Sequence, residues 1–293
     1  DNVEGVYLHV QIGQLLEQLH RGHAEEVSLQ LAWHFQAAGF TIKAVNYLRE
    51  AGERAVRLSA NEAAINHLTR GLVLLQNLPD TDDRLQLELD LLTSLGPALI
   101  VTKGYAAPEV EQIYVRAREL CQQIGTPHQL FQVLTGLWQC SFVGAKFQRA
   151  SELAEQIFHH FQHVQEPAVL LTAHWALGTT FYFMGELTSA RDHLEQAIAL
   201  YDSQQHHDLT FSFGQDPRLF ALLYVSHTLW LLGYPDQALK LSGTALNLTK
   251  EAVHPYNLAI TLSLAAVLYY LRRTEQAAQH LAQEAITLST RHG

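Results

Sequence analysis

The stretch that decides the fold runs from Gly185 to Tyr201 and reads GELTSARDHLEQAIALY. Its apolar residues recur at helical spacing and form one stripe along a helix. They are Leu187, Ala190, Leu194, Ala197, Ile198 and Tyr201. Two of the six are alanines, and a small side chain at a helix crossing lets the neighbouring backbone come close. The stretch therefore predicts a helix that packs tightly against a partner helix.

A second helix is expected directly before this one, from Leu170 to Met184. It carries Leu177 and Gly178, then Phe181, and it stops at Gly185, because a glycine just past a helix can adopt the left-handed conformation that ends it. The unit is helix, glycine turn, helix. Its landmark residues match the tetratricopeptide (TPR) pattern position by position. We therefore predict a TPR-like antiparallel helix pair.

Weaker copies of this unit flank it on both sides. They are Ala38 to Ala44, Gly144 to Ala150, Leu231 to Leu239 and Tyr270 to Ala277. The equivalent small residues Ala150, Ala190, Ala238 and Ala277 are separated by 40, 48 and 39 residues. These intervals exceed the roughly 34 residues of a minimal TPR and approach the roughly 40 residues of HEAT-type repeats. The recurring turn and small residue favour TPR-like repeats with long helices or connections.

These patterns predict an all-α fold of TPR-like antiparallel helix pairs stacked into a right-handed superhelix, an α-solenoid. Residues 1–24 are expected to be a linker helix from an upstream domain, and residues 25–293 the repeat array. No strand is expected. The predicted helices are 3–20, 25–38, 41–58, 61–77, 82–101, 107–124, 127–142, 147–163, 167–184, 187–202, 216–232, 235–251, 255–271 and 274–291.

Composition narrows the class of protein. Of 293 residues, 48% are hydrophobic and 16% charged, as in folded domains. The apolar runs are interrupted before the roughly 20 residues of a membrane span, so no membrane association is expected. A net charge of -10 and the lack of a basic run disfavour direct nucleic-acid binding. The two cysteines, Cys121 and Cys140, form no paired motif, which favours a reducing, cytoplasmic location.

Several stretches carry a resemblance to a known group. They are Leu95 to Val110 (LGPALIVTKGYAAPEV), Arg116 to Gly125 (RARELCQQIG), His193 to Asp202 (HLEQAIALYD), Gly214 to Pro217 (GQDP) and Leu229 to Leu239. Together they resemble the C-terminal TPR-like region of large bacterial signalling ATPases of the AAA/STAND type, often with a nucleotide cyclase or other effector domain upstream. The resemblance is best from about Leu85 onward. It implies a sensor or scaffold region, with any ATPase or cyclase activity in upstream domains. The chain opens at Asp1 and its single methionine is Met184, so we expect it to be a fragment.

Motifs that carry chemistry are missing. The sequence contains no GxxxxGK[ST], GxSxG, HExxH or GxGxxG, so we expect no catalytic residues, no cofactor and no metal. His159 and His163 lie four residues apart and could share a metal ion, but no further ligands stand near them. Solvated histidines on an outer helix face are the favoured interpretation. Both cysteines fall in apolar patterns and are expected to be core thiols.

A long loop from Asp202 to Gln215 separates two of the repeats and contains His206, His207 and Asp208. Such loops in compact arrays are functional or disordered. The three residues are candidates for ligand contact, with a polar surface loop as the alternative. We hypothesise that the loop folds over the concave face and shapes the binding groove.

The first helix of each TPR pair lines the inner face of the array, which supplies candidates for a binding groove. The candidates are Trp138, Trp175, Thr179, Tyr182, Phe220, Tyr224, His227, Trp230, Tyr269 and Tyr270. Tyrosine and tryptophan suit recognition because they combine apolar area with a hydrogen-bonding tip. Ordinary core packing is the alternative for each. The Lys and Asn clamp by which other TPR domains hold acidic C-terminal tails is absent, so an apolar or amphipathic peptide fits better.

Two functions are compatible with these features. The first is a non-catalytic protein-interaction or autoregulatory module that binds a peptide, a partner protein or its own upstream ATPase domain in the groove. The second is a small-molecule effector sensor with the ligand under the 202–215 loop. A deep, closed aromatic pocket would favour the sensor, and an open groove the scaffold. Self-association through the terminal helices is a further possibility, because terminal repeats need a polar cap or a partner.

Overall fold

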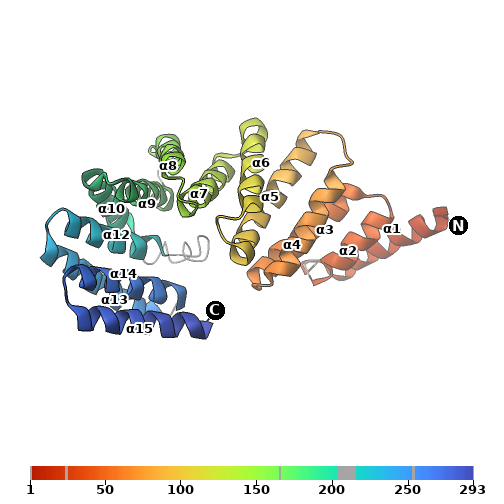
Figure 1. The fold of residues 1–293 in the computed structure, drawn as a ribbon. Helices are drawn as coiled ribbons and strands as arrows, with labels where there is room; N and C mark the ends of the chain where they lie inside the picture. Colours follow the sequence, from red (N-terminus) through yellow and green to blue (C-terminus); the bar gives the residue numbers. More distant parts are fainter. Residues whose placement is uncertain (1, 24–25, 165, 203–215, 253–254, 293) are drawn as a thin grey trace. The chain divides into compact units, whose positions relative to one another are not determined.

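The computed structural model describes residues 2–23, 26–164, 166–202, 216–252 and 255–292 (Figure 1). These residues form fourteen α-helices and no strand. They divide into two compact units, Asp1–Lys146 and Phe147–Gly293. The N-terminal unit contains α1 (Asn2–Leu19), α2 (Ser28–Ala37), α3 (Thr41–Arg57), α4 (Asn61–Leu75), α5 (Asp82–Lys103), α6 (Pro108–Ile124) and α7 (Pro127–Val143). The C-terminal unit contains α8 (Phe147–Phe161), α9 (Pro167–Met184), α10 (Leu187–Leu200), α12 (Pro217–Leu231), α13 (Pro235–Ala252), α14 (Pro255–Leu271) and α15 (Glu275–His292).

Within each unit the helices stack in sequence order. Each helix packs against the next, and the first helices of successive pairs also touch: α3, α5 and α7 in one unit, and α9, α12 and α14 in the other. The all-α fold of stacked antiparallel pairs is therefore confirmed, and the predicted helix ends agree within about three residues. The helix at residues 2–19 packs on α2; its role as a linker from an upstream domain stays a prediction.

Helix starts follow local chemistry. Proline occupies the first turn of α6, α7, α9 and α12, where its missing N–H leaves no hydrogen bond unmade. Thr126 and Gln129 form a reciprocal capping box at the start of α7. The Asp216 carboxylate accepts from the backbone N–H of Arg218 at 2.9 Å and caps α12.

Six turns between helices share one motif. A residue with positive φ ends the helix before the turn. The N–H of the residue after it donates to the carbonyl five positions back, as the Glu186 N–H does to the Phe181 carbonyl at 2.9 Å. A buried alanine follows the positive-φ residue by five positions in every case. The pairs are Gly39 and Ala44, Ser59 and Ala64, Ala145 and Ala150, Gly185 and Ala190, Gly233 and Ala238, and Arg273 and Ala278. The packing alanine of the last pair is thus Ala278, and the prediction of Ala277 was wrong by one residue.

Small residues bring the paired helices into close contact. A Cβ built on Gly178 of α9 would lie 2.6 Å from Leu194 Cγ and 2.9 Å from the Leu194 backbone nitrogen on α10. Gly52 of α3 meets Leu68 of α4 at a similar distance of 2.5 Å. A methyl group at Gly178 would push α9 and α10 apart because a backbone atom stands in its way, whereas at Gly52 the Leu68 side chain would have to shift.

One helix among the described residues, α5, is long and apolar enough to cross a membrane by length and composition. Its contacts are those of a core helix, because it packs on α4 and α6. It also buries Glu88, which forms ion pairs with Arg84 at 3.0 Å and Arg116 at 2.7 Å. A buried carboxylate paired with two guanidinium groups is the arrangement expected in the interior of a folded protein.

Both cysteines are free and buried, as the sequence predicted. Burial raises the pKa of the Cys121 thiol to about 11. The thiol therefore stays protonated near neutral pH and acts as a packing group.

Candidate binding surface on the first helices of the C-terminal unit

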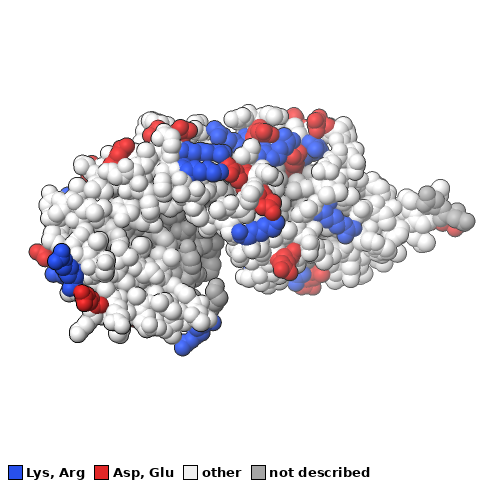
Figure 2. Space-filling view, in the orientation of Figure 1, with Lys and Arg blue, Asp and Glu red and all other residues white. Residues whose placement is uncertain are grey.

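The two kinds of helix in the C-terminal unit differ sharply in charge. The first helices α9, α12 and α14 carry one Asp, Glu, Lys or Arg between them, which is Arg218. Their partners α10, α13 and α15 carry three or four each. In Figure 2 the surface over α12 and α14 is largely uncharged, with charged side chains at its left edge. The layer formed by the first helices is therefore nearly neutral.

Aromatic rings connect α9 to α12 across this layer. The Trp175 ring lies 6.5 Å from Phe220, and Phe220 lies 6.4 Å from Tyr224. Tyr224 is 5.4 Å from Tyr182 and 5.7 Å from Phe183. We call these five residues the aromatic cluster. Their tilted and edge-to-face arrangements are the favourable geometries for aromatic pairs.

His227 joins three successive first helices. Its Nε2 lies 2.9 Å from the Leu264 carbonyl of α14, which can only accept, so Nε2 carries the proton. Nδ1 is then free to accept from the Tyr182 hydroxyl of α9, at a long 3.5 Å. Burial lowers the pKa of His227, although the bond to the Leu264 carbonyl works in the opposite direction. A neutral imidazole thus orients the Tyr182 hydroxyl at neutral pH.

Burial sorts the predicted groove residues of this unit into two groups. Trp175, Thr179, Phe220 and His227 are 1–6% exposed and pack between helices. Tyr182, Tyr224, Trp230 and Tyr269 are half-buried, and Phe183 beside them is 44% exposed. The accessible part of the aromatic cluster therefore consists of Tyr182, Phe183 and Tyr224.

Other predicted site residues lie apart from this cluster. Trp138 belongs to the N-terminal unit, where it is buried and stacks on Phe142 at 5.5 Å. Tyr270 is 71% exposed and lines a groove between α14 and α15. His206, His207 and Asp208 lie outside the described residues. Their part in ligand contact stays a prediction.

Sequence reasoning missed a histidine pair. His174 of α9 and His193 of α10 face each other with their Nδ1 atoms 3.0 Å apart, so one ring donates to the other. Phe158 of α8 packs its ring against both. Burial, reinforced by the neighbouring His193, lowers the pKa of His174 to about 4, which keeps the pair neutral. Within the described part of the chain, no group of three or more His, Cys, Asp or Glu side chains is placed to hold a metal.

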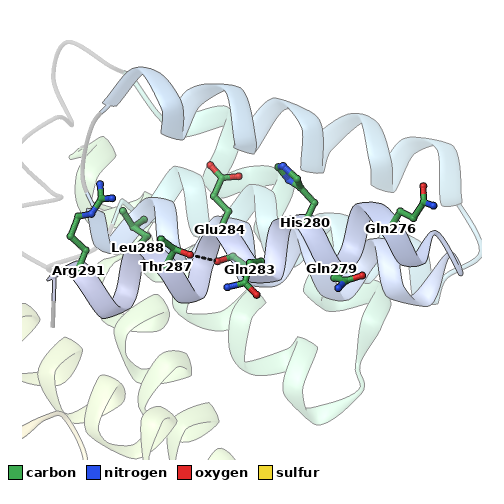
Figure 3. Close-up of a pocket in the computed structure, with 8 residues that line it drawn as sticks. All are labelled: Gln276, Gln279, His280, Gln283, Glu284, Thr287, Leu288 and Arg291. Carbon is green, nitrogen blue, oxygen red and sulfur yellow. Dashed lines mark hydrogen bonds between the residues drawn. The ribbon is translucent and has the colours of Figure 1, made fainter.

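The last helix, α15, borders two hollows. One, of about 800 Å³, runs along a polar face of α15 (Figure 3). Its lining residues are Gln276, Gln279, His280, Gln283, Glu284, Thr287, Leu288 and Arg291. The other, of about 810 Å³, lies between α14 and α15 and is lined mainly by apolar and small side chains. The two faces of α15 thus differ in polarity.

The stacked pairs, left-handed turn residues and packing alanines define a TPR-like helical-repeat region. No protein-family model matches the chain. Over 265 residues the chain is 24% identical to an uncharacterized protein, R02095, from Rhizobium meliloti (strain 1021). The match covers 89% of this chain and 26% of that protein. The chain thus spans about a quarter of the length of this curated relative.

Solved structures agree with this fold. A signal transduction ATPase with numerous domains (STAND) and a tetratricopeptide-repeat sensor, from Pyrococcus horikoshii, is 12% identical with a TM-score of 0.64. The match covers 96% of this chain and 42% of that one. A Rap protein complexed with Competence and Sporulation Factor is 11% identical with a TM-score of 0.55, over 89% and 80% of the two chains. At these identities the likeness shows the fold alone.

Proposed function

We propose that this chain is the non-catalytic interaction module of a larger bacterial signalling ATPase that acts in the cytoplasm. It binds a peptide or a partner domain on the layer of first helices in the C-terminal unit. The observation that carries the proposal is the neutral surface of α9 and α12, from which Tyr182, Phe183 and Tyr224 remain accessible. Two solved structures support it, because one is a signal transduction ATPase with a tetratricopeptide-repeat sensor and the other is a Rap protein complexed with a factor.

The chemistry of the layer determines the kind of partner. Partner charges would lose hydration on a neutral face without gaining an ion pair, so a charged peptide gains little there. Aromatic rings contribute apolar area, and the Tyr182 and Tyr224 hydroxyls provide a few hydrogen bonds. An apolar or amphipathic segment, such as one presented by the upstream ATPase domain, matches this surface best.

The test is affinity capture with the 293-residue chain, followed by mass spectrometry of the bound proteins. The variant Tyr182→Ala plus Tyr224→Ala is compared with Tyr7→Ala plus Tyr234→Ala, whose tyrosines are exposed on α1 and in the α12–α13 turn. We expect the first variant to lose its specific partners and the second to retain them. A first variant that keeps both its fold and every partner would contradict the proposal.

A second candidate is the sensor function, with a small molecule under the 202–215 loop. It is motivated by His206, His207 and Asp208 and by the sensor named in the STAND structure. Mass spectrometry of small molecules retained by the purified chain tests it, together with limited proteolysis of the loop. Rapid cleavage there with and without the retained molecule would exclude this site.

A further inference from the structure

Histidines from adjacent helices meet in direct contact at two places in the chain. In the C-terminal unit His174 of α9 faces His193 of α10, and in the N-terminal unit His9 of α1 faces His34 of α2. Each pair brings its Nδ1 atoms to 3.0 Å from each other. Each also has its ring centroids 5.1 Å apart. The same contact thus forms twice, between different helices.

These two distances determine how the rings point at each other. A centroid separation of 5.1 Å is close to the largest that a 3.0 Å separation of the nitrogens allows, because each nitrogen lies on the rim of its own ring. The Nδ1 atoms of His174 and His193 therefore lie nearly on the line that joins the two ring centres. In the neutral pair one proton occupies this line, with a nitrogen on either side of it.

Aromatic rings surround the His174–His193 pair. The Phe158 ring of α8 lies 5.2 Å from His174 and 5.7 Å from His193, and the Phe181 ring lies 5.7 Å from His193. Burial is the main cause that lowers the pKa of both histidines, although Asp192 acts in the opposite direction on His193. Neither ring takes up a second proton near neutral pH, so the pair remains able to bind a metal ion.

The number and direction of the nitrogens decide which kind of cation fits. Zinc in structural sites takes four ligands in a tetrahedron, and among the described residues no third His, Cys, Asp or Glu completes a set with these two rings. Two nitrogens in line instead suit a monovalent d10 ion with linear two-coordination, and imidazole is a normal ligand of copper. One positive charge also costs less to place among phenyl rings than two. Cu(I) meets both conditions.

We infer that His174 and His193 form a two-coordinate site for Cu(I), which joins α9 to α10 through their Nδ1 atoms. Two bonds of about 2 Å require these nitrogens to move apart by roughly 1 Å. Both rings are only half-buried, so rotation of the side chains provides this movement without separating the helices. The proton on the donating Nδ1 moves to Nε2 of the same ring by exchange with water, so no net proton is released. The site contains no member of the aromatic cluster and does not depend on the proposed function.

The experiment titrates the purified 293-residue chain with Cu(I) under anaerobic conditions with ascorbate, in competition with the coloured chelator bicinchoninate. The parent chain carries His34→Phe, so that the pair of His9 and His34 does not contribute. His174→Phe and His193→Gln are compared with His159→Gln, which removes an exposed histidine of α8. We expect each of the first two to weaken binding more than about a hundredfold, since losing even an outer-shell partner of a metal ligand costs roughly 10–100-fold. His159→Gln should bind Cu(I) as the parent does.

Two further measurements identify the ligand atoms. Ag(I), which shares the linear preference of Cu(I) and is stable in air, is added to the chain labelled with ¹⁵N in histidine. We expect the Nδ1 resonances of His174 and His193 to shift and to split by coupling to silver. X-ray absorption of the Cu(I) form should show two nitrogen neighbours and no sulfur, which excludes the thiols of Cys121 and Cys140. One equivalent of Ag(I) should also raise the thermal unfolding midpoint, because the paired nitrogens exist only in the folded chain.

Four results would overturn the inference. They are no uptake of Cu(I) in competition with the chelator, uptake that folded His174→Phe and His193→Gln chains retain, equal loss with His159→Gln, and a copper–sulfur neighbour in the absorption spectrum. Zn(II) is the comparison ion and should raise the unfolding midpoint less than Ag(I) does. A larger rise with Zn(II) would show a site with more ligands and would contradict two-coordination.

Discussion

Replacing Gly178 by alanine tests the close packing on which the helix pairs depend. The new methyl group would lie 2.6 Å from Leu194 Cγ and 2.9 Å from the Leu194 backbone nitrogen. A side-chain carbon can move by rotation about χ1 and χ2, but the backbone nitrogen can move only with α10. The substitution therefore forces α9 and α10 apart, along with the core that both helices share.

The expected change in the free energy of unfolding for Gly178→Ala is the difference between two opposing effects. Overpacking of a close core costs typically 1–3 kcal/mol, and a clash with backbone belongs near the upper end, about 3 kcal/mol. Alanine recovers roughly 1 kcal/mol, because glycine is the poorer helix former. We therefore expect Gly178→Ala to lower the free energy of unfolding by about 2 kcal/mol.

The matched control is Gly243→Ala in α13, where an added Cβ would meet no atom within 4 Å. Only the helix-propensity term remains there, so this variant should be more stable by up to about 1 kcal/mol. Urea denaturation followed by far-UV circular dichroism measures both variants under the same conditions. The reasoning is refuted if Gly178→Ala raises the unfolding midpoint as Gly243→Ala does.

Three further predictions concern the turns, the histidine pair and a buried ion pair. Ala145→Gly should stabilise the chain by about 1 kcal/mol in thermal unfolding, because glycine adopts φ 55° without strain; a lower midpoint would contradict this. Unfolded His174 titrates near its ordinary pKa of 6.5 and the folded residue near 4, so stability should fall as pH drops between these values; His174→Phe, followed by urea denaturation across this range, should flatten that slope. Glu88→Gln should cost about 3 kcal/mol by leaving Arg84 without its buried carboxylate, and an unchanged urea midpoint would refute this.

Much of the fold was predictable because local signals agree with the tertiary contacts. The stripe around Leu194 sets the buried face of α10, and Gly185 marks the turn before it. The prediction placed the last turn one residue early. The left-handed residue of this turn is Arg273, and an arginine does not mark such a position in a sequence as a glycine does. Without that signal, Ala277 and Ala278 cannot be told apart from the sequence.

The accessible part of the site was harder to predict. The first helices α9, α12 and α14 are apolar all round, so their periodicity does not reveal which face a neighbour covers. Trp175 and Tyr182 looked alike in the sequence, yet one is buried and the other half-exposed. The contact between His174 and His193 was missed because it joins two helices, and no spacing along one helix indicates it.

The near absence of charge from α9, α12 and α14 also has a kinetic consequence. A neutral face exerts no long-range attraction, so encounters with a freely diffusing partner proceed at the unassisted rate of roughly 10⁵–10⁶ per molar per second. The face itself adds no field for salt to screen, so the salt dependence of that rate comes from charges elsewhere on the chain, whose net charge is -10. Such a face works best when its partner is already close by, and tethering within one polypeptide provides a high effective concentration.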